Sequence, residues 1–147
     1  MRFLLTLSCA AMLAACAGSA PPLPQGGEAT LQVPGATIRA NVIPTRNLGA
    51  DMAARYGIPR GDELVMLLVG VRGTGEAGQA SLPARVTAHA TDLRGNREQI
   101  ALRELEAGGL VDHVGTFHVS PSETLSFVVE VQRDGAPPAT LRFSHDF

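Results

Sequence analysis

The chain has 147 residues, with 12 basic and 14 acidic side chains and a formal net charge of −2 at pH 7. This near-neutral balance, without a basic cluster, argues against a nucleic-acid-binding surface. All the basic residues are arginines, which excludes lysine-nucleophile and Schiff-base chemistry. The absence of tryptophan and the single tyrosine disfavour a stacking platform for sugars or bases.

Residues 1–15 have the pattern of a bacterial signal peptide. Arg2 supplies a positive start, and the apolar run that follows is about a dozen residues long, too short for the ~20 that span a bilayer. The run ends in Leu-Ala-Ala-Cys, which resembles a lipobox and predicts that Cys16 becomes the acylated first residue of the mature protein. The alternative is an ordinary signal peptide, cleaved after Ala17 or Ala20.

Residues 16–35 are rich in proline and glycine and predict a flexible tether between the lipid and a domain over 36–147. Alternating apolar residues near its end, from Ala29 to Val33, predict a short edge strand. Because Ala17 is not the aspartate that commonly retains lipoproteins at the inner membrane, we expect a lipid-anchored protein of the cell envelope that faces the periplasm from the outer membrane. Its first partner is then the membrane itself, reached through the N-terminal lipid.

The domain is predicted to be all-β. Residues 37–43 alternate apolar and polar side chains, as a half-buried strand does, and residues 63–72 are apolar on both faces, as expected of a central strand. Strand patterns recur about every ten residues up to the C-terminus, with glycine, asparagine or proline turns between them. This spacing predicts an antiparallel β-sandwich of about seven strands.

One short helix interrupts the strands at residues 48–57, with Asp51 in its first turn and Gly57 where a left-handed cap belongs. Met52 and Tyr56 are expected to cover the outer face of the central strand. The predicted core takes one face of the central strand and the apolar faces of the last three strands: Leu64, Met66, Leu68, Phe117, Leu125, Phe127, Val129, Leu141 and Phe143.

Two stretches, NVIPTRNLGADMAARYGIPR and FHVSPSETLSFVVEVQ, resemble an uncharacterised family of small exported bacterial proteins, domain of unknown function 4426. The resemblance covers about residues 36–147. It implies an exported, β-rich, immunoglobulin-like domain. It implies no activity and no catalytic residues.

Local signatures of catalysis or cofactor binding are weak. GTGEAG at 73–78 matches a dinucleotide-binding pattern, but the next segment alternates like a strand, where that site needs a helix, so we expect no cofactor. His113 and His118 are five residues apart on one strand and should point to opposite faces. The alternative to a protein without a metal is a site built from His113, His145 and Asp146.

We therefore predict a non-catalytic binding or accessory module that contacts an envelope protein, without nucleic acid, metal or cofactor. The candidate contact residues are Arg46, Asn47 and Arg55, which lie in and beside the helical insertion; solvation of the helix is their alternative role. The competing function is an envelope enzyme or metal-binding protein that uses strand histidines and carboxylates.

Overall fold

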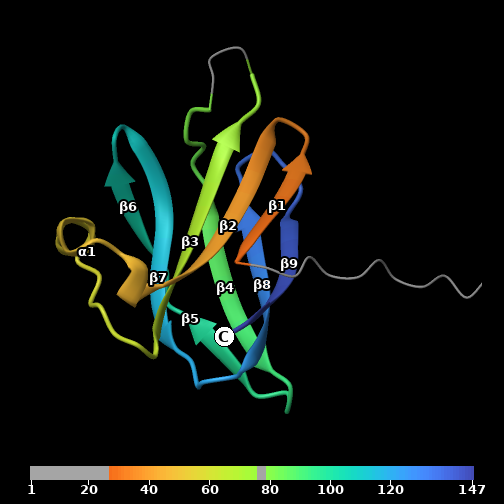
Figure 1. Cartoon of the computed structure of the whole chain (residues 1–147). Helices are drawn as coiled ribbons and strands as arrows, with labels where there is room; N and C mark the ends of the chain where they lie inside the picture. Colours follow the sequence, from red (N-terminus) through yellow and green to blue (C-terminus); the bar gives the residue numbers. More distant parts are fainter. Residues whose placement is uncertain (1–26, 76–78) are drawn as a thin grey trace, which may run out of the picture.

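The computed structural model describes residues 27–75 and 79–147, which form two antiparallel sheets and one short α-helix (Figure 1). One sheet has the order β1-β2-β3-β7-β6 and the other β5-β4-β8-β9. No helix among these residues is long and apolar enough to cross a membrane. The predicted signal peptide, Cys16 and the tether up to residue 26 lie outside the described residues. The strands are β1 (Glu28–Val33), β2 (Ala36–Pro44), β3 (Leu64–Gly73), β4 (Arg85–Asp92), β5 (Arg97–Ile100), β6 (Arg103–Ala107), β7 (Leu110–His118), β8 (Thr124–Gln132) and β9 (Ala139–Asp146).

The two sheets confirm the predicted all-β sandwich, and the arrangement is compatible with an immunoglobulin-like fold. Two features raise the strand number from about seven to nine. The edge strand expected from Ala29 to Val33 is present as β1, which pairs with β2 throughout its length. The single strand expected after the turn at residues 94–96 is divided into β5 and β6, which belong to different sheets.

Side chains from the inner faces of the two sheets form one hydrophobic core. At its centre the rings of Phe127 and Phe143 stack with centroids 4.9 Å apart, and Phe117 meets Phe127 edge-on at 5.6 Å. Six of the expected core residues are buried here: Phe117, Leu125, Phe127, Val129, Leu141 and Phe143. Period-two alternation oriented β8 and β9 correctly because most of their apolar side chains share one face, and it placed Phe117, the largest apolar side chain of β7, in the core.

The expected orientation of β3 was wrong. Its sandwich face consists of the valines and one leucine of the alternate set, whereas Met66 and the half-buried Leu64 and Leu68 point away from the core. Met66 and Leu68 belong to a second, smaller apolar cluster beneath the helix. Because both faces of β3 are apolar, the sequence pattern carried no information about which face the second sheet would cover. The residues of the sandwich face are Val65, Leu67, Val69 and Val71.

Helix α1 (Ala50–Tyr56), preceded by the 3-10 turn η1 (Thr45–Asn47), lies beside β6 and β7 in Figure 1. The apolar cluster beneath this insertion contains Met66 of β3 and Val114 of β7, so the insertion covers the outer face of these strands. Gly57 ends α1 in the left-handed conformation with φ 61°, as predicted, and the next N–H, of Ile58, reaches back to the carbonyl of Ala53 at 2.8 Å. The covering side chains are Leu48, Ala53 and Ile58, with Tyr56 partly buried. Met52 is largely exposed, so it is not the cover that we expected.

The chain changes sheets between β5 and β6, at residues 101–102. There it passes directly over Gly115 of β7, where a built Cβ atom would collide with the carbonyl oxygen of Ala101 and lie 3.0 Å from side-chain atoms of Ile100 and Leu102. Only glycine leaves room for the crossing backbone. The division of the expected strand therefore depends on a residue of another strand.

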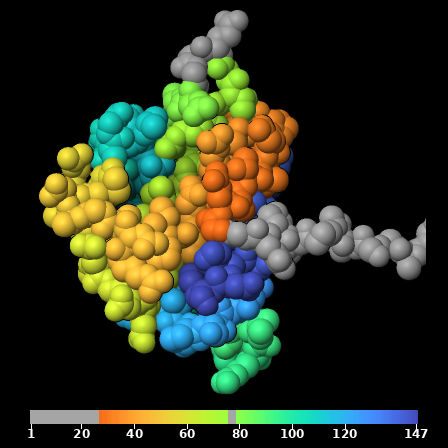
Figure 2. All heavy atoms as spheres, viewed as in Figure 1, coloured from red at the N-terminus to blue at the C-terminus, as the bar shows by residue number. Residues whose placement is uncertain are grey.

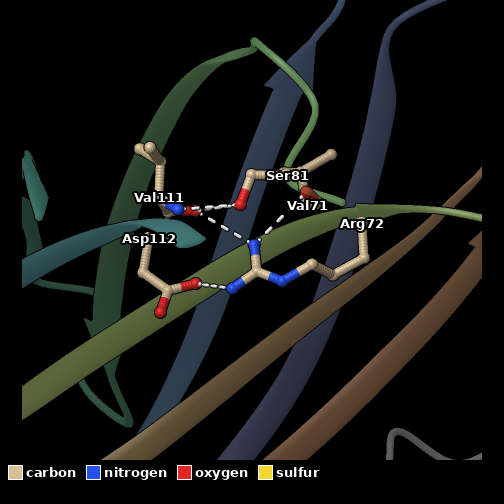
Figure 3. Close-up of polar contacts among 5 residues, drawn as sticks. All are labelled: Val71, Arg72, Ser81, Val111 and Asp112. Carbon is tan, nitrogen blue, oxygen red and sulfur yellow. Dashed lines mark hydrogen bonds and ion pairs between the residues drawn. The ribbon is translucent and has the colours of Figure 1, made fainter. Parts of the chain in front are cut away.

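A half-buried ion pair joins the end of β3 to the beginning of β7 (Figure 3). The guanidinium of Arg72 on β3 bonds the carboxylate of Asp112 and donates to the carbonyl of Val111 at 3.0 Å. Ser81, in the segment that leads into β4, accepts from the N–H of Val111 through Oγ at 2.7 Å. These contacts join β3 and β7 of one sheet to the start of the other sheet. We call Arg72, Ser81 and Asp112 the clasp.

We predict that Gly115→Ala will lower the free energy of unfolding by about 3 kcal/mol or more, at the upper end of overpacking effects, because the atom in the way is backbone. Gly75→Ala is the control, since no atom of the described residues lies within 4 Å of its Cβ position; it should change stability by about 0.5 kcal/mol or less. Urea unfolding followed by circular dichroism measures both values. Equal stabilities of the two variants would contradict the close approach.

Candidate functional site

One end of the sandwich contains a cavity of about 540 Å³, which we call the end pocket. It lies where the end of β2, the start of β3, the β7–β8 turn and the C-terminal residues of β9 converge. In Figure 2 the orange and yellow surface of residues around 44–63 meets the dark blue C-terminal residues and the lighter blue β7–β8 turn on one face. The apolar part of its lining consists of Pro44, Val65, Val119, Pro121 and Phe147.

Charged side chains surround the apolar part of the end pocket. Arg46, Asp62, Glu63 and Asp146 line it and are exposed. The apolar lining is buried at Val65 and half-buried at Pro44, Val119 and Phe147, so the charges form the rim and these apolar groups the floor. The ring of His145 completes the wall and packs edge-on against Phe147, with centroids 4.6 Å apart. The pocket thus combines an apolar floor with three carboxylates and one guanidinium.

A buried hydroxyl fixes the wall that follows β2. Thr45 has an exposed fraction of 0%, and its Oγ1 donates to the carbonyl of Leu64 at 2.9 Å and accepts from the N–H of Gly61 at 3.0 Å. Arg60 donates to the carbonyl oxygen of Arg46 at 3.0 Å. These bonds tie the start of the helical insertion to its end, so Arg46 and Asp62 keep their places on the rim.

The opposite wall is a tight turn between β7 and β8. Glu123 accepts from the N–H of Ser120 at 2.8 Å, and its own carbonyl accepts from the N–H of Phe147 at 2.9 Å. Ser122 has a φ of 62°, an uncommon left-handed conformation for a non-glycine residue. Thr124 donates to Asp146 at 2.8 Å. The turn and the C-terminal residues therefore form one bonded wall.

The four histidines do not gather into a metal site. His113 and His118 lie on opposite faces of β7 as predicted: His113 is 7% exposed, with no hydrogen-bond partner for Nδ1 among the described residues, and His118 is exposed. His89 accepts from Arg97 at Nδ1, and its pKa is lowered mainly by burial and then by that arginine. Within residues 27–75 and 79–147, no three His, Cys, Asp or Glu side chains are placed to hold a metal.

The sequence matches the family described as Domain of unknown function (DUF4426) over residues 32–147. The chain belongs to the DUF4426 family. None of the curated proteins with which the sequence was compared matches it. The family match covers the sandwich from within β1 to the last residue of the chain, so the end pocket is built entirely from the matched region.

Two solved structures are similar to this DUF4426 chain. A DUF4426 family protein from Pseudomonas aeruginosa PAO1 has a TM-score of 0.70 and 25% sequence identity, over 82% of this chain and 94% of that one. A copper-bound variant of FetP from uropathogenic Escherichia coli has a TM-score of 0.60 and 8% identity, over 82% of this chain and 95% of that one. At 8% identity the second likeness concerns the fold alone.

The structure separates the candidate residues of this DUF4426 chain. Arg46 lies on the rim of the end pocket, whereas Asn47 and Arg55 are exposed outside its lining. His145 and Asp146 line the same pocket, but His113 lies farther along β7, where Nε2 is 3.8 Å from Oε1 of Glu104. The metal-site alternative built from these three residues is therefore not assembled.

Sequence reasoning missed the two walls of the pocket. Neither the acid pair of Asp62 and Glu63 nor the Ser120-Pro121 turn was among the candidate residues named from the sequence. The signal that could have located the pocket is that both segments adjoin strand ends. Strands β3 and β7 pair with Leu64 opposite His118, so the segments just before β3 and just after β7 meet at one end of the sheet.

We predict that Thr45→Val will lower the free energy of unfolding by about 1–3 kcal/mol, because the buried N–H of Gly61 loses its acceptor. Thr45→Ser keeps the hydroxyl and should cost less. Thermal unfolding of the two variants tests this, and amide exchange at Gly61 should accelerate in the valine variant only. If valine proves as stable as serine, Thr45 does not fix the pocket wall.

Proposed function

We propose that this DUF4426 chain is a periplasm-facing lipoprotein of the outer membrane that acts as a non-catalytic binding module, with the end pocket as its binding site. The observation that carries the proposal is the cavity of about 540 Å³, which has an apolar floor and a charged rim. Sites that bind ligands or partner side chains have this size and this combination of linings. Its walls are held by hydrogen bonds from both sides, so the site is preformed and loses little freedom on binding.

The chemistry around the pocket favours binding over catalysis. A serine nucleophile needs a hydrogen-bonded base. Among the described residues, neither Ser120 nor Ser122 shares a side-chain hydrogen bond with His145, the imidazole of the pocket. The carboxylates of the rim are exposed, so a partner can reach them to form ion pairs.

The position of Gly27, near the end pocket, supports the proposal that the domain is tethered to the membrane through its N-terminal segment. Gly27 accepts from the N–H of Val42 at 2.6 Å, and its Cβ position would be 3.8 Å from Cε1 of His145, which lines the end pocket. The eleven residue-to-residue steps from Cys16 to Gly27 reach about 35 Å when extended at ~3.1 Å per residue. A lipid on Cys16 would thus hold the pocket end of the sandwich close to the membrane.

We predict that Cys16 carries lipid and that Cys16→Ser releases the protein from membranes into the soluble periplasmic fraction, because the acyl chains supply the membrane affinity. Mass spectrometry of the N-terminal peptide and fractionation of the envelope measure the two effects. If the mature protein begins at an unmodified Gly18 or Pro21, Cys16 is not lipidated and the lipoprotein part of the proposal is wrong.

We predict that Ser120→Trp abolishes partner binding in the native envelope, because the exposed Ser120 lines the end pocket and an indole there fills it. Thr87→Trp, on the exposed face of β4, is the matched control and should leave binding unchanged. Chemical crosslinking from the tethered protein, with identification of the captured proteins, gives the readout. Equal capture by both variants would exclude the end pocket, and stoichiometric metal or substrate turnover in the purified protein would refute the non-catalytic module.

A further inference from the structure

A second hollow lies beside the end pocket, across the β7–β8 turn. This side pocket, of about 300 Å³, is lined by the β4–β5 turn and by residues 120–124, and it shares Ser120, Pro121 and Ser122 with the end pocket. In Figure 2 the green β4–β5 turn, the lighter blue β7–β8 turn and the dark blue C-terminal residues follow one another on one face. The two pockets are therefore neighbouring parts of one surface, divided by a single ridge.

Leu93 stands at the outer margin of this surface. It is 82% exposed, more than any other large hydrophobic side chain among the described residues. Its turn is nevertheless fixed: the carboxylate of Asp92 accepts from the N–H of Arg94 and of Asn96, both at 2.8 Å, and from the side-chain amide of Asn96 at 2.7 Å. The Asn96 side-chain bond is the main cause that lowers the pKa of Asp92, so the carboxylate stays charged at neutral pH.

An apolar side chain in a fixed, solvated turn contributes little to the core, and it loses little conformational entropy when a partner covers it. Single exposed leucines are common on protein surfaces and need no explanation by themselves. Leu93 differs because it adjoins two pockets that share a wall. A small ligand would fill the end pocket and leave Leu93 uncovered.

The charges around the two pockets are mostly negative. Five carboxylates line them against two guanidinium groups, although the whole chain has a net charge of only −2. Complementary charge steers a positively charged partner to such a surface and suppresses acidic ones. The carboxylates belong to Asp62, Glu63, Asp92, Glu123 and Asp146, and the guanidinium groups to Arg46 and Arg94.

We propose that the two pockets and Leu93 form one docking surface for a polypeptide segment of an envelope protein, a segment in which an apolar side chain adjoins basic residues. The inference rests on the proposed function and names its partner class. The apolar side chain of the partner enters the end pocket, its basic groups meet the carboxylates of the rim, and Leu93 contacts the partner beyond the ridge.

A photocrosslinking phenylalanine analogue, placed one position at a time at Leu93, Asp62 and Leu110 of the full chain in its native envelope, tests the proposal. Leu110 is the matched control: it is a 37% exposed leucine at the start of β7, next to the β6–β7 turn, which lies at the opposite end of the sandwich from the β4–β5 turn (Figure 1). Positions 93 and 62 should capture the same segment of the same protein, with basic residues next to an apolar one, and position 110 should not capture it.

Leu93→Ser and Leu110→Ser supply the second measurement, using the captured segment as a synthetic peptide. Leu93→Ser should weaken binding of the peptide roughly tenfold or more, as loss of an interface anchor does, while the melting temperature stays unchanged. Leu110→Ser should leave both values unchanged.

The outcomes separate this inference from the proposed function. Capture from position 62 alone, or unchanged peptide affinity in Leu93→Ser, would overturn the extended docking surface and leave the end pocket as the binding site. Crosslinking of position 93 to lipid, or to an acidic segment, would also overturn it. If neither position 62 nor position 93 captures a protein, and Ser120→Trp has no effect on capture, both proposals fail.

Discussion

The burial of β3 on both faces is the constraint on which the rest of the architecture depends. One face packs into the core between the sheets, so the other needs a cover from outside the sandwich. Ala53 of helix α1 and the flanking Leu48 and Ile58 supply it. The chain must therefore leave the sheet after β2 and return to it before β3. The hydrogen bonds of Thr45 to Gly61 and Leu64 join the beginning of this helical insertion to its end. These bonds also place Arg46 and Asp62 beside the end of the sheet, so the wall of the end pocket is a by-product of covering β3.

Sequence patterns within single segments predicted where most strands and the helix lie. Alternation located β2, β4, β7, β8 and β9, and the spacing of apolar residues with a terminal glycine located α1. The pattern could not decide which face of β3 enters the core, because its two faces are equally apolar and only the position of α1 distinguishes them. It also missed the change of sheet at residues 101–102. What makes room for that crossing is the missing side chain of Gly115 on another strand, so no inspection of residues 97–105 could have found it.

The candidate site was predictable only in fragments. Arg46, His145 and Asp146 were singled out from the sequence for different reasons, and the structure brings them to one pocket. The pocket itself arises where four segments converge, which is a property of strand pairing rather than of any motif. His113 is buried opposite Val69 of β3 and does not line the pocket, so it lies apart from His145 and Asp146. Membership of the DUF4426 family agrees with the sandwich fold and assigns no role to these residues.

The chain enters the sandwich at the same end as the pocket, and this has a mechanical consequence. Force applied from the N-terminal side first loads the bond between Gly27 and Val42, and then the pairing of Glu28 with Asn41 at the beginning of β1. These pairs lie near the end of β2, from which Pro44 and Arg46 reach the pocket, whereas the clasp of Arg72 and Asp112 lies at the far end. A pull on the N-terminal segment would open the β1–β2 ladder from the pocket end. Tension in that segment would therefore act first on bonds that adjoin the wall of the end pocket.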